Sequence, residues 1–128
     1  MSEKRRVVIV EPYKLPKVSF IEDSLEGMQS VVGGYIELFK TTESGIDLFC
    51  NEEGKLEHLE LNRFFPDLMD IVSGNILAIG HDGEGKSVSL TDEQVKEAVS
   101  MFIYEYPPTI FINTGTNIVP IAMRFPDE

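Results

Sequence analysis

Short hydrophobic runs separated by turn residues dominate the first part of the chain. The unbroken apolar run at residues 7–10 is typical of a buried strand and stops at Pro12, and residues 17–21 can return as a second extended segment. A short helix follows, which Asp23 or Ser24 can cap. Three apolar residues share one face of it: Leu25, Met28 and Val32. The pair Gly33-Gly34 ends this helix, because glycine tolerates positive φ.

The middle of the chain has the pattern of strands and tight turns. Residues 35–40 and 46–50 predict a hairpin, and a turn at residues 51–54 leads to a third extended segment at residues 55–59. We therefore expect a three-stranded meander. The apolar stretch at residues 70–80 predicts either a strand pair or one long strand with a bend at Gly74.

A second helix carries the strongest local signal. Thr91 and Gln94 have the spacing of a capping box, in which each side chain bonds the backbone N–H of the other residue. Five residues then form one apolar stripe: Val95, Ala98, Val99, Phe102 and Ile103. Pro107-Pro108 ends the helix, and residues 109–113 and 118–124 predict a final hairpin.

These elements fit one small domain that spans residues 1–128. The chain has no internal repeat, no low-complexity tract and no linker long enough to divide it. We expect an α+β fold with a mostly antiparallel sheet, two helices on one face and a C-terminal hairpin.

Composition places the chain among ordinary globular proteins. Its 128 residues are 42% hydrophobic and 26% charged, and this length allows a core without disulfides. No apolar run approaches the length of a membrane span or a signal peptide core. The single Cys50 cannot form an internal disulfide, which fits a reducing compartment. We expect a cytoplasmic protein.

The formal charge of −11 is concentrated in the middle of the chain. Residues 43–97 contain 13 acidic and 4 basic residues, whereas residues 1–42 contain 6 of each. This field repels phosphate backbones, so we expect no direct binding of nucleic acid or of an anionic membrane. Two interpretations stay open: the charge keeps the protein soluble, or it presents an acidic face to a basic partner.

One segment matches the phosphate-binding loop pattern G-x-x-x-x-G-K-[ST]: residues 80–87. A phosphate-binding loop must run directly into a helix, but the helix signal here begins later, at Thr91. Asp82 and Glu84 also place negative charge inside the loop, where phosphate oxygens would lie. The sequence therefore favours a polar turn over a nucleotide site.

The remaining candidates for chemistry are sparse. Cys50, His58 and His81 lack metal-ligand spacing, so we expect no metal, and no set of residues supports catalysis or a cofactor. Arg63, preceded by Asn62 and followed by two phenylalanines, could hold an anionic or planar ligand. The alternative is a salt bridge to a nearby acid, with the arginine stem covering the core.

Several segments together resemble the family called domain of unknown function 3846, which is found in bacteriophages and bacterial mobile elements. The resemblance spans about residues 7–102 and rests on five segments: residues 32–37, 50–56, 62–63, 70–75 and 89–94. The resemblance implies a small accessory protein of phage or plasmid type in a bacterial host cell, and no particular reaction. It leaves residues 104–128 as a C-terminal extension. The polar and glycine positions of the pattern give the candidate ligand or partner surface: Gly33, Gly34, Tyr35, Asn51, Asn62, Arg63 and Asn75.

Three functions of different class follow from these observations. The first is a non-catalytic acidic protein that binds and inhibits a host defence protein with a basic surface. The second is a small-molecule binder that sequesters a nucleotide-like signal or metabolite, with Tyr35 stacking and Arg63 holding a phosphate. The third and weakest is a nucleotide hydrolase that uses residues 80–87. Edge strands such as residues 109–113 also allow a homo-oligomer.

Overall fold

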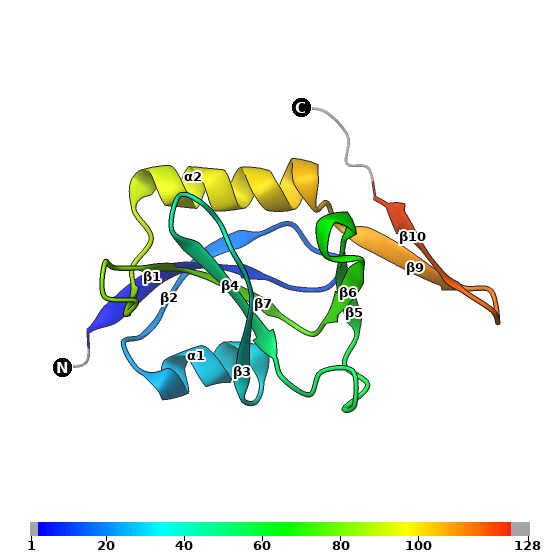
Figure 1. Cartoon of the computed structure of the whole chain (residues 1–128), viewed down its shortest axis with the longest axis horizontal. Coiled ribbons are helices and arrows are strands. Elements are labelled where there is room, and N and C mark those ends of the chain that lie inside the picture. Colours follow the sequence, from blue (N-terminus) through cyan, green and yellow to red (C-terminus); the bar gives the residue numbers. More distant parts are fainter. Residues whose placement is uncertain (1–2, 124–128) are drawn as a thin grey trace.

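A twisted antiparallel sheet forms the centre of the molecule in the computed structural model, which describes residues 3–123 (Figure 1). Its strand order is β2-β1-β7-β4-β3, so β7 joins the hairpin β1-β2 to the hairpin β3-β4, and the short β8 pairs with the end of β7. The strands are β1 (Lys4–Val10), β2 (Lys17–Glu22), β3 (Ile36–Thr41), β4 (Ile46–Asn51), β7 (Ile76–His81) and β8 (Ser87–Val88).

The two helices cover opposite faces of this sheet (Figure 1). The helix α1 (Leu25–Val32) packs against a cluster that includes Val7, whereas α2 (Asp92–Ser100) packs against a cluster that includes Val8. Successive strand residues point to opposite faces, so the apolar run of β1 supplies both clusters. The α+β class, the antiparallel sheet and the C-terminal hairpin are confirmed, but the placement of both helices on one face is corrected.

Local signals fix the ends of both helices. The Thr91 hydroxyl accepts from the Gln94 N–H at 3.1 Å, and the Gln94 side chain accepts from the Thr91 N–H at 3.0 Å, which confirms the capping box. Ser24 caps α1 by accepting from the Gly27 N–H at 3.0 Å. Gly33 ends α1 in the left-handed region, with φ of 78°. The helix α2 continues as a π-helical turn, Met101–Glu105.

Two smaller hairpins complete the fold. The first joins β5 (Leu61–Phe65) to β6 (Asp70–Ser73) through a 3-10 turn at Pro66–Leu68. The second joins β9 (Thr109–Asn113) to β10 (Ile118–Ala122) and projects from the body (Figure 1). The predicted final hairpin is thus confirmed to residue 122, and its predicted end at Arg124 lies outside the described residues.

The third strand of the predicted meander is wrong. Residues 52–58 form consecutive turns: the Gly54 N–H donates to the Asn51 carbonyl at 3.2 Å, which closes a tight turn, and His58 adopts a positive φ of 56°. The strand begins later, at Leu61, and pairs with β6 instead of β4. Residues 70–80 form two strands with Gly74 between them at φ of 79°, but these strands do not pair with each other: β6 pairs with β5, and β7 pairs with β1 and β4.

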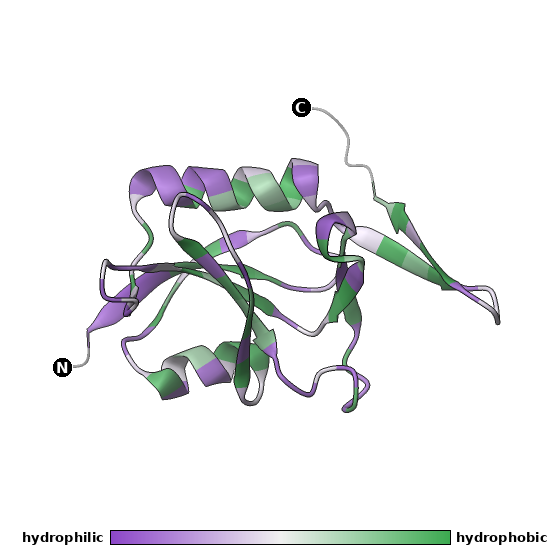
Figure 2. Ribbon diagram, viewed as in Figure 1, coloured by the Kyte–Doolittle hydropathy of each residue, from purple (hydrophilic) through white to green (hydrophobic). Residues whose placement is uncertain are grey.

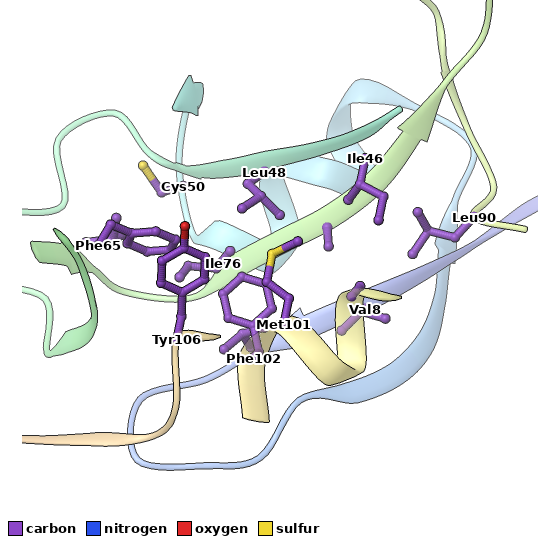
Figure 3. Packing of buried hydrophobic residues seen from close by; sticks show 14 residues of the cluster. Val8, Ile46, Leu48, Cys50, Phe65, Ile76, Leu90, Met101, Phe102 and Tyr106 are labelled. Carbon is purple, nitrogen blue, oxygen red and sulfur yellow. The ribbon is translucent and has the colours of Figure 1, made fainter. Parts of the chain in front are cut away.

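Aromatic side chains fill the larger core, between the sheet and α2 (Figure 3). The ring of Phe65 lies 4.2 Å from that of Tyr106, 5.2 Å from Phe39 and 6.3 Å from Phe102, measured between centroids. Hydrophobic colour follows the central strands, whereas the first half of α2 is mostly hydrophilic (Figure 2). Tyr106 thus ties the chain after the π-helical turn into the same core as Phe65 on β5.

Candidate functional site

Asn62 and Arg63 lie inside the protein, where they hold segments that are far apart in the sequence. The Arg63 side chain is fully buried, with 0% of the residue exposed. Its guanidinium donates to the carbonyl oxygens of Tyr106 at 2.8 Å and Lys14 at 2.6 Å, and to Asn62 Oδ1 at 2.8 Å. Asn62 Nδ2 donates to the carbonyl oxygens of Val10 at 2.8 Å and Gly74 at 2.7 Å. The pair therefore supplies donors to backbone acceptors from three segments that are distant in the sequence: residues 10–14, Gly74 and Tyr106.

The environment of Arg63 differs from both sequence-based alternatives. The structure gives it no carboxylate partner among residues 3–123, and its donors point to carbonyl and amide oxygens instead of a ligand. Desolvation by burial lowers the pKa of Arg63 to about 10. At neutral pH it therefore remains a charged donor to neutral acceptors.

Asn51 and Asn75 hold the end of α1. Asn51 Nδ2 donates to the Val32 carbonyl at 3.2 Å, and Asn75 Nδ2 donates to the Val31 carbonyl at 3.0 Å. The last carbonyls of a helix have no partner within the helix, so these two amides supply one. Gly34 lies close to Asn51, because a Cβ at this position would lie 2.8 Å from Asn51 Nδ2. The small residue lets the chain turn beside that side chain.

A shallow depression of about 470 Å³ contains part of the predicted surface. Gly33 and Asn75 line it, together with the loop residues Glu11, Lys14 and Glu60. Tyr35 is 69% exposed and does not line this depression, and Gly34, Asn51, Asn62 and Arg63 do not line it either. The structure thus gathers Gly33 and Asn75 at one hollow but separates the other candidates from it.

The segment that matches the phosphate-loop pattern folds as a hairpin turn between β7 and β8. The Asp82 carboxylate accepts from the backbone N–H groups of Glu84 and Lys86, both at 2.9 Å, and these bonds lower its pKa. Amides that would cradle a phosphate are therefore occupied by an acidic side chain. The helix begins at Asp92, beyond β8.

One polar pair, Asp47 and His81, was not predicted from the sequence. His81 Nδ1 and Asp47 Oδ1 lie 2.9 Å apart, and the Thr41 hydroxyl donates to the same oxygen at 2.9 Å. Asp47 is buried in β4, so an acid in an otherwise apolar strand was the available hint. The nearby Ser44 hydroxyl donates to Glu97 Oε2 at 2.6 Å, so no hydrogen bond links it to the imidazole. The pair orients a histidine but lacks an adjacent nucleophile among residues 3–123.

Cys50 lies at the edge of the larger core, beside a cavity of about 150 Å³ (Figure 3). Burial raises the pKa of its thiol to about 11, and the nearby carboxylates of Glu37 and Asp70 act in the same direction. A thiol with this pKa is protonated at neutral pH and is a weak nucleophile. Among residues 3–123, no three histidine, cysteine, aspartate or glutamate side chains form a group that could hold a metal.

Acidic side chains gather where three segments meet at one end of the sheet. The Gln94 amide donates to the Ser44 carbonyl at 2.8 Å, and the His81 N–H donates to the Gly45 carbonyl at 3.2 Å, which joins the β3-β4 turn to α2 and to β7. We call this surface the acidic end. Its carboxylates are exposed or half-buried: Glu43, Asp82, Glu84, Asp92, Glu93 and Glu97.

Few positive charges compensate the acidic end. Lys86 and Lys96 lie on the same segments, and Arg6 of β1 forms an ion pair with Asp92 at 2.8 Å. The ion pair occupies one carboxylate, whereas Glu43, Glu84 and Glu93 extend into solvent. The fold thus brings together carboxylates from three segments that are far apart in the sequence.

Comparison with known proteins identifies the family of the chain. None of the helices within residues 3–123 has the length and apolar character that crossing a bilayer requires. No curated protein and no solved structure matches the chain. A family model described as domain of unknown function (DUF3846) matches residues 4–103, so the chain belongs to this family, as the resemblance predicted.

Proposed function

We propose that the protein is a non-catalytic acidic accessory protein, of phage or mobile-element origin, that binds a basic surface of a host protein and inhibits it. The acidic end carries this proposal. It joins three segments through hydrogen bonds between their backbones and side chains, so its carboxylates are held on ordered elements. A backbone that is already ordered loses little conformational freedom when an oppositely charged surface covers it.

The positions of Asn62 and Arg63 support a protein partner over a phosphorylated ligand. The donors of Arg63 are committed to carbonyl and amide oxygens of the protein itself, and none of the residue is exposed. A ligand phosphate would have to replace bonds that hold the fold. The side chains of the acidic end, in contrast, have free acceptor capacity at the surface.

The proposed interaction makes a specific prediction about salt. Surface carboxylates and a basic partner attract each other over about 8–10 Å at physiological ionic strength, and salt weakens this attraction. Complex formation should therefore be fast and should weaken as salt rises. The host protein would be inhibited because its basic surface is covered, without any change in a covalent bond.

A matched pair of charge variants tests the proposal. The first replaces three carboxylates of the acidic end: Glu43→Gln, Glu84→Gln and Glu93→Gln. The control replaces three carboxylates in the loop of residues 52–60: Glu52→Gln, Glu57→Gln and Glu60→Gln. Both variants change the net charge equally, so a difference in partner binding between them shows that the position of the carboxylates matters.

The readout is capture of host proteins from a bacterial lysate on immobilised wild type and variants at low and high salt. We expect wild type and control to retain the same basic protein at low salt, and the acidic-end variant to lose it. Equal retention by all three proteins, or no retained protein at either salt, contradicts the proposal. The captured protein is then assayed for inhibition by the wild type and by both variants.

A second candidate function is sequestration of a small polar molecule. The depression lined by Gly33 and Asn75 favours this function. The backbone can approach a ligand closely at Gly33, and the side-chain carbonyl oxygen of Asn75 can accept a hydrogen bond from it, because only the Asn75 Nδ2 is used at the end of α1. Native mass spectrometry of the protein with a panel of nucleotides and host extract tests this function. A bound species that is lost in Lys14→Gln supports it, and the absence of any bound species contradicts it.

A further inference from the structure

The cavity of about 150 Å³ beside Cys50 lies where the open end of the β3-β4 hairpin meets β6. Glu37 of β3 and Cys50 of β4 are cross-strand partners that line it, together with the loop of residues 51–56. The loop runs close to β6 at Gly54, where a Cβ would lie 3.0 Å from the Ser73 carbonyl oxygen. The turn at the other end of the same hairpin belongs to the acidic end, so the cavity is a separate site.

Ser73 contributes a buried hydroxyl that has no partner. The residue is 5% exposed, and its Oγ forms no hydrogen bond with any atom of residues 3–123. Within this part of the chain, it is the one buried side-chain nitrogen or oxygen without a partner. Leaving a buried hydroxyl unpaired destabilises the folded state, so such a group requires an explanation. A ligand in the cavity that Ser73 lines would give the hydroxyl a partner.

The lining of the cavity combines apolar and acidic side chains. The apolar ones come from four segments: Phe39, Leu56, Leu68, Ile71 and Val72. Among the described residues that line it, Lys55 is the one basic residue, and it forms an ion pair with Asp70. Glu37, Glu52 and Glu53 form no ion pair within residues 3–123. Unpaired carboxylates around a partly apolar space favour a ligand that is both cationic and aliphatic.

The Cys50 thiol indicates the sign of the potential at the cavity wall (Figure 3). Burial is the largest cause that raises its pKa to about 11, and the carboxylates of Glu37 and Asp70 act in the same direction, against Lys55. These carboxylates do not converge on a metal, because the described residues contain no group of three suitable ligands. Dispersed carboxylates suit an organic ammonium, which donates in several directions, better than a metal ion.

We propose that this cavity binds a small amine with a neutral hydrogen-bonding group at its other end. The protonated amino group lies at the carboxylates of Glu37, Glu52 and Glu53, and the short aliphatic body contacts the apolar wall. The neutral end exchanges a hydrogen bond with Ser73 Oγ. A cavity of 150 Å³ holds a molecule of roughly six non-hydrogen atoms, the size of benzene. Short linear amino alcohols such as 4-aminobutan-1-ol have this size.

A wider hollow of about 520 Å³ also borders Ser73 but has a different charge pattern. Of the described residues that line it, Asp70 is the one with a carboxylate, and Lys55 pairs with that carboxylate. His58 adds a second basic side chain. This hollow therefore has no excess of negative charge that would select an amine, whereas the cavity beside Cys50 does.

Titration of the ¹⁵N-labelled full chain with matched probes, followed by the amide signals at neutral pH, tests the inference. The probes are 4-aminobutan-1-ol, butylamine, butane-1,4-diol and butanoate, of which the last three lack the hydroxyl, lack the ammonium and reverse the charge. We expect 4-aminobutan-1-ol to shift the signals of residues 52–55 and 71–73 with a dissociation constant of about 0.1–10 mM, since so few atoms bind weakly. Butylamine should bind at least about threefold more weakly, and the diol and butanoate should not saturate the protein.

Ser73→Ala separates a ligand-binding role from a structural one. Because the hydroxyl has no partner in the fold, its removal should leave the midpoint of urea unfolding unchanged or raised. It should also abolish the preference for 4-aminobutan-1-ol over butylamine. Glu37→Gln with Glu53→Gln should weaken binding of both amines by about fivefold or more. The matched control at the acidic end, Glu43→Gln with Glu93→Gln, should leave their binding nearly unchanged.

Four results overturn the inference. The first is no saturable shift with 4-aminobutan-1-ol up to about 50 mM, and the second is equal binding of the diol or of butanoate. The third is a Ser73→Ala protein that loses stability or keeps the preference for the amino alcohol. The fourth is a control pair that weakens binding as much as the Glu37 and Glu53 pair. Tighter binding of Nα-acetyl-lysine methylamide than of 4-aminobutan-1-ol overturns the assignment to a free amine. Failure of host-protein capture leaves these expectations unchanged, because the acidic end lies outside the cavity.

Discussion

Replacing Arg63 with methionine separates a structural role of this residue from a ligand-binding role. Methionine keeps a long apolar stem but removes the guanidinium and all of its donors. Two buried acceptors then lose a partner, the Tyr106 carbonyl and Asn62 Oδ1. The Lys14 carbonyl lies nearer the surface, where water can replace the lost donor.

The magnitude follows from these contacts. Leaving a buried acceptor without a partner costs about 1–3 kcal/mol, so two such acceptors give a loss of about 2–6 kcal/mol. Removing a buried charge that has no carboxylate partner offsets part of this loss, since desolvation already lowers the pKa of Arg63 to about 10. We therefore expect Arg63→Met to lower the free energy of unfolding by about 3 kcal/mol.

The assay is urea unfolding followed by far-ultraviolet circular dichroism, because the chain contains no tryptophan. The control is Lys4→Met, which replaces an exposed cation that pairs with Glu22 at the surface. A surface ion pair contributes about 0–1 kcal/mol, so this control should lose about 1 kcal/mol or less. If Arg63→Met unfolds within about 0.5 kcal/mol of wild type, the hydrogen bonds of Arg63 do not hold the fold and the reasoning is refuted.

Further predictions concern a helix cap, a glycine and a thiol. Thr91→Ala removes the capping box and should cost about 1 kcal/mol in urea unfolding, whereas Thr116→Ala in the exposed turn between β9 and β10 should cost almost nothing. Gly27→Ala should destabilise the protein by about 2 kcal/mol despite the better helix propensity of alanine, because the added Cβ would overlap the Glu22 carbonyl. The control is Gly83→Ala, where a Cβ would meet open space, and a Gly27→Ala protein that is more stable than wild type contradicts the expected overlap. Folding raises the pKa of Cys50 from 9.0 to about 11, so the stability that the protonated thiol contributes is complete below pH 9 and is lost as pH rises through 11. Between pH 8 and 11, the free energy of unfolding of wild type should therefore fall by about 2 kcal/mol more than that of Cys50→Ala. Parallel pH profiles of the two proteins contradict this prediction.

Local signals in the sequence predicted the elements that depend on neighbouring residues. The capping box at Thr91 and the apolar stripe after it located α2, because both act within a few residues of each other. Gly33 marked the end of α1 for the same reason. The positions of these elements relative to the sheet depend on which face of each strand is covered. The unbroken run at residues 7–10 contained this information, since a strand that is apolar on both faces needs cover on both.

The candidate site was harder to predict because long-range contacts determine it. In the sequence, Arg63 is one of few basic residues in an acidic segment, which is typical of a surface residue. In the structure, the Lys14 and Tyr106 carbonyl oxygens, which are 43 or more residues away in sequence, accept hydrogen bonds from it. The amides of Asn51 and Asn75 are likewise committed to α1. Of the expected candidate surface, Tyr35 remains as an exposed aromatic side chain, and Gly33 and Asn75 remain beside a hollow.

The central place of β7 also has a consequence for biosynthesis. The strand pairs with β1 on one side and β4 on the other, and its contact with β1 closes a loop of almost 70 residues. A nascent chain that has left the ribosome only as far as Asn51 can form the hairpins β1-β2 and β3-β4 but has no strand to unite them. Assembly of the sheet must therefore wait for Ile76–His81, and the apolar residues of the first strand need protection from aggregation during that interval.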